Sequence, residues 1–201
     1  PVKNIIITGN KEVKDYEIIE AANLKNYPSF ISINKSKITK TLKQNPFIKD
    51  VQIKKNFKFQ ITINVTEEKV VAYNLTNQSY LLSNGTYIND KNFLGVPQLN
   101  NYTPEDVLKN FAEELGKLDE DIIADISEIE YSPSKNETGE TIDSTRFKLK
   151  MKDGNTVYIN VKKCNVLSYY NQIYASLKDK KGVLNLDSGN YERYVLTLYE
   201  E

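Results

Sequence analysis

The side chains of this 201-residue chain that could do chemistry are mainly carboxylates, serines and lysines. Glu67 or Glu68 could join a distant acid in a glycosidase-like carboxylate pair, and a serine with a lysine could form a Ser-Lys dyad. No spacing singles out either arrangement. Glu67 and Glu68 are neighbours at the end of a strand-like run, so they point to opposite faces and cannot act on one bond. We therefore expect no catalytic residue.

The chain has a single cysteine, Cys164, and no histidine. An intrachain disulfide, a Cys-His dyad, a Ser-His-Asp triad and a His-ligated zinc site are therefore excluded. We expect Cys164 to be a structural residue. We also expect no metal, no cofactor and no small-molecule substrate.

The formal net charge of zero hides two opposed parts. Residues 1–67 carry 12 Lys against 2 Asp and 4 Glu, a charge of +6, whereas residues 68–201 carry 15 Lys or Arg against 21 Asp or Glu, a charge of −6. Such asymmetry indicates two domains, 1–67 and 68–201, with different surroundings, although two merely solvated surfaces would give the same count.

The stretch from Val51 to Val65 alternates between apolar and polar residues. As a single strand it would span roughly 50 Å, so it must fold back as a hairpin. The polar run Lys54, Lys55 and Asn56 is the predicted corner. One face then carries the apolar side chains, and Phe59 is predicted to lie in the core. These apolar residues are Val51, Ile53, Phe59, Ile61, Ile63 and Val65.

Two amphipathic helices are predicted upstream of the hairpin, one within residues 13–24 and one within residues 32–45, where Pro46 ends the second. A strand at residues 5–8 precedes them. The resulting order is β-α-α-β-β, a three-stranded sheet with two helices on one face.

These residues resemble the POTRA domain of the FtsQ/DivIB cell-division family. In that family an I-x-x-x-G-N strand leads to two helices, an N-P-x-I/V strand and a strand closed by V-x-E. The matching residues here are Gly9, Asn10, Asn45, Pro46, Ile48, Val51, Ile53, Val65 and Glu67. The resemblance implies an α+β fold with an N-terminal POTRA domain, followed by a larger α+β domain with an antiparallel sheet.

The second domain shows its own turn and helix signals. Asn84-Gly85 predicts a two-residue type I′ hairpin, and Thr103 with Pro104 predicts the start of a helix. Strands are predicted at 126–131, 146–152 and 156–161, with a mobile loop from Ser132 to Ser144. A further helix over about 166–177 precedes two closing strands, the last from Tyr191 to Tyr199.

Lysines 54, 55 and 58 cluster at the predicted hairpin with nearby aromatics, a combination that nucleic-acid surfaces use. The alternation argues against that use because it places Phe59 in the core. The resemblance implies a single membrane-spanning helix just before the POTRA domain, so we expect these lysines to face an anionic membrane surface instead. We expect no nucleic acid as a partner.

The final strand is the predicted partner-binding site. An open sheet edge lets a partner peptide add itself as another strand, and aromatic and Arg side chains dominate interface energetics. By resemblance, the closing strands bind FtsL and FtsB/DivIC-type division proteins. The predicted contacts are Tyr191, Arg193, Tyr194, Val195, Leu196 and Tyr199, although each tyrosine could equally only pack on the sheet.

The sequence therefore predicts a non-enzymatic division scaffold that helps control septal peptidoglycan synthesis. The chain begins at Pro1 and enters a strand at once, so we expect a longer, single-pass membrane protein whose cytoplasmic N-terminus lies upstream. Two alternatives remain open, a POTRA-type chaperone or transport module for polypeptides and, less favoured, a cell-wall hydrolase.

Overall fold

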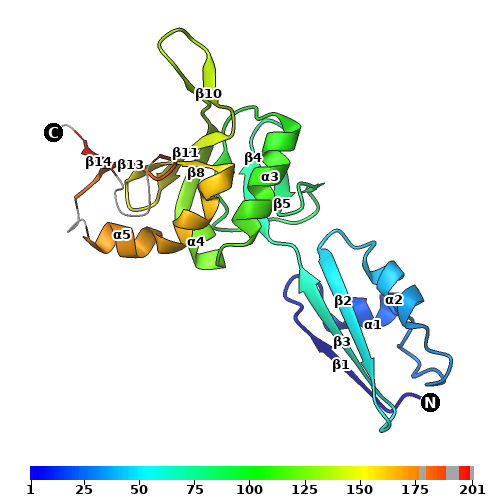
Figure 1. Cartoon of the computed structure of the whole chain (residues 1–201). Helices are drawn as coiled ribbons and strands as arrows, with labels where there is room; N and C mark the ends of the chain where they lie inside the picture. The colour runs from blue at the N-terminus through cyan, green and yellow to red at the C-terminus, as the bar shows by residue number, and fades with distance from the viewer. Residues whose placement is uncertain (177–179, 189–194, 200–201) are drawn as a thin grey trace. The chain divides into compact units, whose positions relative to one another are not determined.

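The computed structural model describes residues 1–176, 180–188 and 195–199. It divides the chain into two compact units, unit 1 at residues 1–69 and unit 2 at residues 70–201. Unit 1 carries the blue and cyan N-terminal elements in Figure 1, and unit 2 carries the elements that follow.

Unit 1 has the predicted β-α-α-β-β order. Its elements are β1 (Asn4–Thr8), α1 (Asp15–Ala21), α2 (Lys35–Leu42), β2 (Ile48–Lys55) and β3 (Gln60–Glu67). The central strand β3 pairs in parallel with β1 and antiparallel with β2. Both helices lie on one face of the sheet (Figure 1), and buried side chains such as Ile18, Leu42 and Ile63 form the core between the two layers.

The β2–β3 hairpin turns at residues 56–59, slightly later than predicted. The Asn56 carboxamide oxygen accepts the N–H groups of Lys58 and Gln60, at 2.9 and 3.3 Å. Phe59 has a left-handed backbone (φ +57°), which interrupts the alternation of faces. Its ring is 43% exposed, so its predicted place in the core is wrong, and it packs edge-on against Phe30. Phe57 is exposed at the tip.

Two residues of the POTRA-like motif have structural roles in unit 1. Gly9 adopts φ +82°, and a Cβ there would overlap the carbonyl oxygen of Val65 on β3. The Glu67 carboxylate accepts the N–H groups of Glu12 and Val13, both at 2.9 Å. Glu67 therefore fastens the segment that leads into α1 to the end of β3, because main-chain N–H groups need an acceptor where no strand provides one.

Unit 2 is built on a nine-stranded sheet with the order β14-β13-β12-β11-β8-β7-β4-β5-β6. The first strands are β4 (Val70–Asn74), β5 (Ser79–Leu82), β6 (Tyr87–Ile88) and β7 (Gln98–Leu99). The middle of the unit holds α3 (Glu105–Gly116), α4 (Glu120–Ala124), β8 (Ile126–Tyr131), β9 (Ser134–Lys135), β10 (Thr141–Asp143), β11 (Arg146–Met151) and β12 (Thr156–Asn160). The last elements are the 3₁₀ helix η1 (Val161–Tyr169), α5 (Tyr170–Ser176), β13 (Gly182–Asn185) and β14 (Val195–Leu198).

The helices pack on one face of this sheet, where a continuous apolar core forms (Figure 1). Phe111 of α3 stacks on Phe147 of β11 at 3.8 Å between ring centroids. Alternate strand residues such as Leu149 and Val157 are fully buried against the helices, as the period of two requires.

The sheet of unit 2 is mixed, so the prediction of an antiparallel sheet is wrong. β7 runs parallel to β4 and β8, and β13 runs parallel to β12. Parallel neighbours need a crossover connection. Helices α3 and α4 provide it between β7 and β8, and η1 with α5 provides it between β12 and β13.

Details of two local predictions in unit 2 are also wrong, although α3 does begin at Glu105, directly after Thr103 and Pro104 as predicted. Only Gly85 of the Asn84-Gly85 pair has a positive φ, and its N–H bonds to Leu82, so the turn is not type I′. Thr103 makes no cap bond to α3, and its buried hydroxyl has no hydrogen-bond partner among the described residues. Within residues 132–144, where the sequence predicts a mobile loop, β9 and β10 form a small hairpin.

The predicted C-terminal helix is divided into η1 and α5, and its expected member Leu177 lies outside the described residues. Cys164 is fully buried within η1. Burial is the main cause that raises the pKa of the Cys164 thiol to about 12, and the nearby Glu114 carboxylate adds a smaller effect. At neutral pH the side chain therefore stays a neutral, packed thiol, in accordance with its predicted structural role.

Gly9 provides a direct test of unit 1. Gly9→Ala should lower the free energy of unfolding of this unit by about 2 kcal/mol or more, because it adds a left-handed backbone penalty and a clash with Val65. Gly95→Ala is the matched control: Gly95 has φ +70°, but a Cβ there would meet nothing within 4 Å. Denaturant unfolding of both variants measures the difference. Equal losses of unfolding free energy in the two variants would show that the close approach of Gly9 to β3 does not contribute to stability.

Candidate partner-binding edge

In the part of the chain that the structure describes, the sheet of unit 2 ends at β14. This strand pairs antiparallel with β13, with Val195 opposite Asn185 and Leu198 opposite Gly182. The Tyr199 N–H donates to the Lys181 carbonyl at 3.2 Å. Hydrogen-bonded and non-hydrogen-bonded pairs alternate in such a ladder. The main-chain groups of Leu196 and Leu198 therefore point away from β13, toward the open edge.

A buried polar clamp holds β13 in place behind β14. Asn155, which is 1% exposed, accepts the Gly182 N–H through its carboxamide oxygen and donates its NH₂ to the Tyr170 hydroxyl, each at 3.0 Å. That hydroxyl donates to Asp153 at 2.6 Å. Burial is the main cause that raises the pKa of Tyr170, and the bond to Asp153 adds to it. The Tyr170 hydroxyl therefore remains a neutral donor. The β11–β12 turn, α5 and the start of β13 are joined as one rigid base.

Glycine is required where β13 and β14 run side by side. A Cβ on Gly182 would overlap the carbonyl oxygen of Thr197 and crowd Leu198. Any larger residue at position 182 would therefore push β14 away from the sheet. The position of the edge strand depends on the absence of a side chain here.

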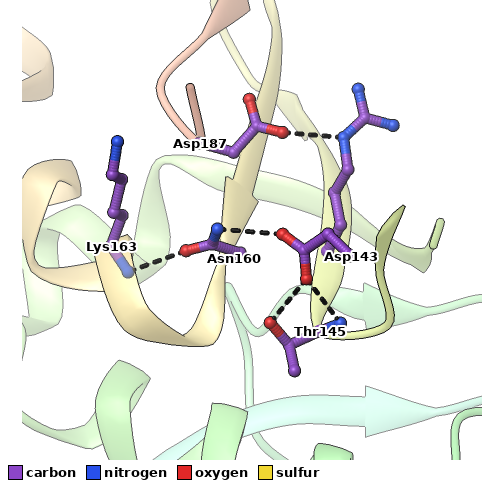
Figure 2. A network of polar contacts seen from close by, with 6 residues as sticks. Asp143, Thr145, Asn160, Lys163 and Asp187 are labelled. Atoms are coloured by element: carbon purple, nitrogen blue, oxygen red, sulfur yellow. Dashed lines mark hydrogen bonds and ion pairs between the residues drawn. The ribbon is translucent and has the colours of Figure 1, made fainter. Parts of the chain in front are cut away.

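A second set of polar contacts surrounds the other ends of β11, β12 and β13 (Figure 2). Asp143 accepts the Thr145 N–H and hydroxyl, both at 2.8 Å, and the Asn160 side-chain NH₂ at 2.9 Å. Asn160 in turn accepts the Lys163 N–H at the start of η1. One carboxylate thus fixes the β10–β11 turn to the place where η1 begins.

The same region contains a largely buried ion pair. The Arg146 Nε donates to Asp187 at 2.8 Å, and its guanidinium carbon lies 3.7 Å from the centroid of the Tyr158 ring. Asp187 follows β13 by two residues, so this pair fixes the direction in which the chain leaves β13. A planar guanidinium can stack and donate at the same time, which a lysine could not do as well.

Only some of the predicted site residues lie among the residues that the structure describes. Tyr191, Arg193 and Tyr194 lie outside the described residues. Val195 and Leu196 belong to β14, and their main chains pair with β13. Tyr199 is 45% exposed, and its hydroxyl lies 2.7 Å from the Thr156 hydroxyl of β12, so it marks the face of the sheet that the helices leave open.

The predicted membrane-surface lysines lie around the β2–β3 hairpin of unit 1. Lys54 and Lys58 are exposed. The Lys55 ammonium instead donates to the Phe30 carbonyl at 2.7 Å and lies 4.5 Å from the centroid of that ring. Lys55 therefore has a structural role in fastening the 22–34 loop to the hairpin.

Sequence reasoning missed the Arg146–Asp187 pair and the Asn155 clamp. Both join residues more than 25 positions apart, and neither position carries a motif. For Arg146 the sequence offers only a weak signal. Arg146 directly precedes the core residue Phe147 in a strand, so its side chain should lie on the face away from the core.

Within the described residues, no group of His, Cys, Asp or Glu side chains could hold a metal ion. No helix in that part of the chain has the length and hydropathy needed to cross a membrane.

Comparison with known proteins decides the family. The FtsQ-type POTRA domain family matches residues 1–68. The cell division protein DivIB of Listeria monocytogenes is 30% identical over 195 residues, covering 93% of this chain and 70% of that protein. DivIB of Bacillus subtilis is 31% identical over 198 residues, covering 94% and 73%.

The chain belongs to the DivIB/FtsQ family.

A solved structure is also similar, that of the major extracytoplasmic domain of the trans isomer of DivIB from Geobacillus stearothermophilus. It is 24% identical, with a TM-score of 0.44, and covers 56% of this chain and 96% of that chain. The chain has an α+β architecture, with the region matched by the FtsQ-type POTRA family followed by a larger domain with a mixed sheet.

DivIB proteins are non-enzymatic division proteins, which rules out the hydrolase interpretation of the carboxylates. Glu67, one of the candidate acids, has instead the structural bonds to Glu12 and Val13. The closing glutamate of the DivIB/FtsQ motif is thus explained by main-chain hydrogen bonding.

Asp143 predicts a pH dependence of stability. Burial acts to raise its pKa, but the hydrogen bonds from Thr145 and Asn160 outweigh burial, and the pKa lies below its ordinary value. Because the folded-state pKa is depressed, the stabilisation is complete above the unfolded pKa of about 3.9 and is lost as pH falls through the folded value.

Asp143→Asn should therefore cost about 1–2 kcal/mol near neutral pH, and its difference from the parent should shrink below about pH 4. Asp90→Asn, at an exposed carboxylate, is the control and should change little. Thermal unfolding from pH 3 to 7 measures both. A difference that is independent of pH would refute the role assigned to the charge.

Proposed function

We propose that the chain is a scaffold of the bacterial division machinery that binds FtsL and FtsB/DivIC-type partners through the open edge of β14. Through these partners it helps control septal peptidoglycan synthesis. Membership of the DivIB/FtsQ family supports the setting. The proposed binding mode rests on the position of β14 as the last strand on one side of the described sheet of unit 2.

The physical basis is strand addition. Leu196 and Leu198 direct main-chain donors and acceptors outward, and an extended partner segment can pair with them. Asn155 and the Arg146–Asp187 pair hold the two ends of β13, the strand on which β14 pairs, so the partner meets an edge that is built on an anchored strand.

In the proposal, selectivity comes from side chains that precede and follow β14 in the sequence. Tyr191, Arg193 and Tyr194 have the aromatic and guanidinium types that dominate interface energies, and they directly precede β14 in the sequence. Tyr199 adds a half-exposed ring next to Thr156.

The proposed location is outside the cytoplasmic membrane. The support is the description of the Geobacillus stearothermophilus DivIB domain as extracytoplasmic, together with the greater length of the relatives. In this proposal a single membrane-spanning helix precedes residue 1, and the N-terminus of the whole protein is cytoplasmic.

Replacing Tyr191, Arg193 and Tyr194 together by Ala tests the side-chain site. Partner affinity should fall about 100-fold or more, because aromatic and Arg anchors each contribute on the order of 2 kcal/mol at interface centres. The matched control replaces Tyr16 and Tyr102, both well exposed elsewhere. Binding of purified FtsL and DivIC-type ectodomains is measured by calorimetry. Unchanged affinity in the triple variant would remove these residues from the site.

Leu198→Pro tests strand addition itself. The ring removes an N–H that faces the open edge, while the bond from Tyr199 to Lys181 remains, and proline is tolerated at such edge positions. Partner affinity should fall at least about tenfold, since one main-chain bond of about 1–1.5 kcal/mol is lost. Leu198→Ser keeps the N–H and should bind nearly as the parent does. Equal binding by both variants would exclude pairing at this edge.

A further inference from the structure

Three segments of unit 1 meet at the tip of the β2–β3 hairpin: the N-terminal residues, the loop between α1 and α2, and the hairpin turn. The Val2 N–H donates to the Pro28 carbonyl and the Lys3 N–H to the Phe59 carbonyl, both at 2.9 Å. Figure 1 shows the N-terminus beside this loop. We call these segments, residues 1–4, 25–35 and 54–60, the hairpin end of unit 1.

Large apolar side chains protrude from the hairpin end. Ile31 is 90% exposed and Phe57 is 89% exposed, and they come from two different segments. Tyr27 and Phe59 are each about half exposed beside them. Isolated exposed apolar residues are ordinary on protein surfaces, but several at one end, almost free of contact with the rest of the fold, mark an interaction surface.

The charge of the hairpin end has one sign. Its three segments contain six lysines and no Asp or Glu; the lysines are Lys3, Lys25, Lys35, Lys54, Lys55 and Lys58. The carboxylates of unit 1 lie in residues 12–20 and at Asp50, Glu67 and Glu68. Asp50 pairs with Thr66, and Glu67 binds Glu12 and Val13, so most carboxylates lie at the opposite ends of the strands. An eight-residue strand separates the two ends by roughly 26 Å.

Side-chain contacts also hold the segments of the hairpin end together. The Lys55 ammonium bonds to the Phe30 carbonyl and covers the Phe30 ring, and Phe30 packs on Phe59 at 5.3 Å between centroids. These contacts keep the loop that carries Ile31 next to the turn that carries Phe57. The two apolar tips are therefore presented together without being covered by the lysines.

We propose that the hairpin end of unit 1 docks on an anionic lipid bilayer, with Ile31 and Phe57 inserted at the level of the headgroups and the exposed lysines of this end bound to lipid phosphates. The charge fits a negative surface. The protruding apolar side chains gain free energy only where an apolar phase lies behind that surface, which a bilayer offers and a soluble polyanion does not. A complementary acidic protein is the alternative that the experiment distinguishes.

This inference goes beyond the proposed function and is independent of it. Partner binding at β14 concerns unit 2, and the variants described below leave unit 2 unchanged. Failure of lipid binding would therefore not affect the proposal for the β14 edge, and loss of partner binding would not affect this one.

The chain has no tryptophan, which makes a single introduced indole a clean reporter. Phe57→Trp should shift its emission to shorter wavelength on addition of phosphatidylglycerol vesicles, and lipids brominated along the acyl chain should quench it. Leu94→Trp, at a position 99% exposed in unit 2, should show neither effect. Vesicles of phosphatidylcholine alone should give a much smaller shift with either variant.

Vesicle flotation separates the two contributions. Lys54→Gln with Lys58→Gln should weaken binding to phosphatidylglycerol vesicles about tenfold or more, and added salt should weaken binding by the parent. Ile31→Ser with Phe57→Ser should weaken it by a similar factor while leaving the lysines in place. The controls are Leu94→Ser, and Lys148→Gln with Lys152→Gln, all in unit 2. All replaced side chains except that of Lys148 are exposed, so unfolding midpoints should stay near that of the parent.

Vesicle binding and Trp emission together test whether the hairpin end docks on an anionic bilayer. Binding that falls with both hairpin-end variants and with neither control supports the proposal. No binding to anionic vesicles, equal binding by the Ile31 and Phe57 variant, or an equal spectral shift from Leu94→Trp would each overturn it. Full displacement of the vesicles by soluble polyglutamate, without any shift of the Phe57→Trp emission, would point to an acidic protein partner instead.

Discussion

Main-chain hydrogen bonding is the constraint on which both units depend. A strand placed inside a sheet must find partners on both sides, and a segment without a strand partner needs a side chain to accept its N–H groups. Glu67 does this for Glu12 and Val13, Asn56 for the hairpin turn, and Asn155 for Gly182. Where no partner exists, the edge stays open, and β14 is such an edge in the described part of unit 2.

The local periodicity of the sequence predicts much of this architecture. The alternation from Val51 to Val65 correctly indicates a hairpin, and the amphipathic patterns of residues 13–24 and 32–45 correctly indicate two helices. Periodicity describes one element at a time, however. It cannot show that β7 and β13 run parallel to their neighbours, because strand direction is set by contacts between residues far apart in the sequence. The prediction that Phe59 lies in the core fails for a related reason, since one residue with a left-handed backbone ends the alternation.

The candidate site could be predicted only in its coarse position. The sequence predicts the final strand at a sheet edge, and among the described residues β14 lies at one. The groups that hold this edge, Asn155, Gly182 and the Arg146–Asp187 pair, leave no pattern in the sequence, because each is chosen by a contact with a distant segment. The family motif shows the same separation between pattern and cause. Gly9 and Glu67 can be recognised by spacing, but their reasons, a close approach to Val65 and two main-chain acceptor bonds, require coordinates.

Within the described residues, β14 offers few main-chain groups to a partner. Four residues direct only the groups of Leu196 and Leu198 outward, and each main-chain bond adds a net stabilisation of about 1 kcal/mol. A few such bonds cannot offset the loss of translational and rotational freedom on association. A partner that binds here must therefore gain most of its affinity from side chains, while pairing fixes its direction and register.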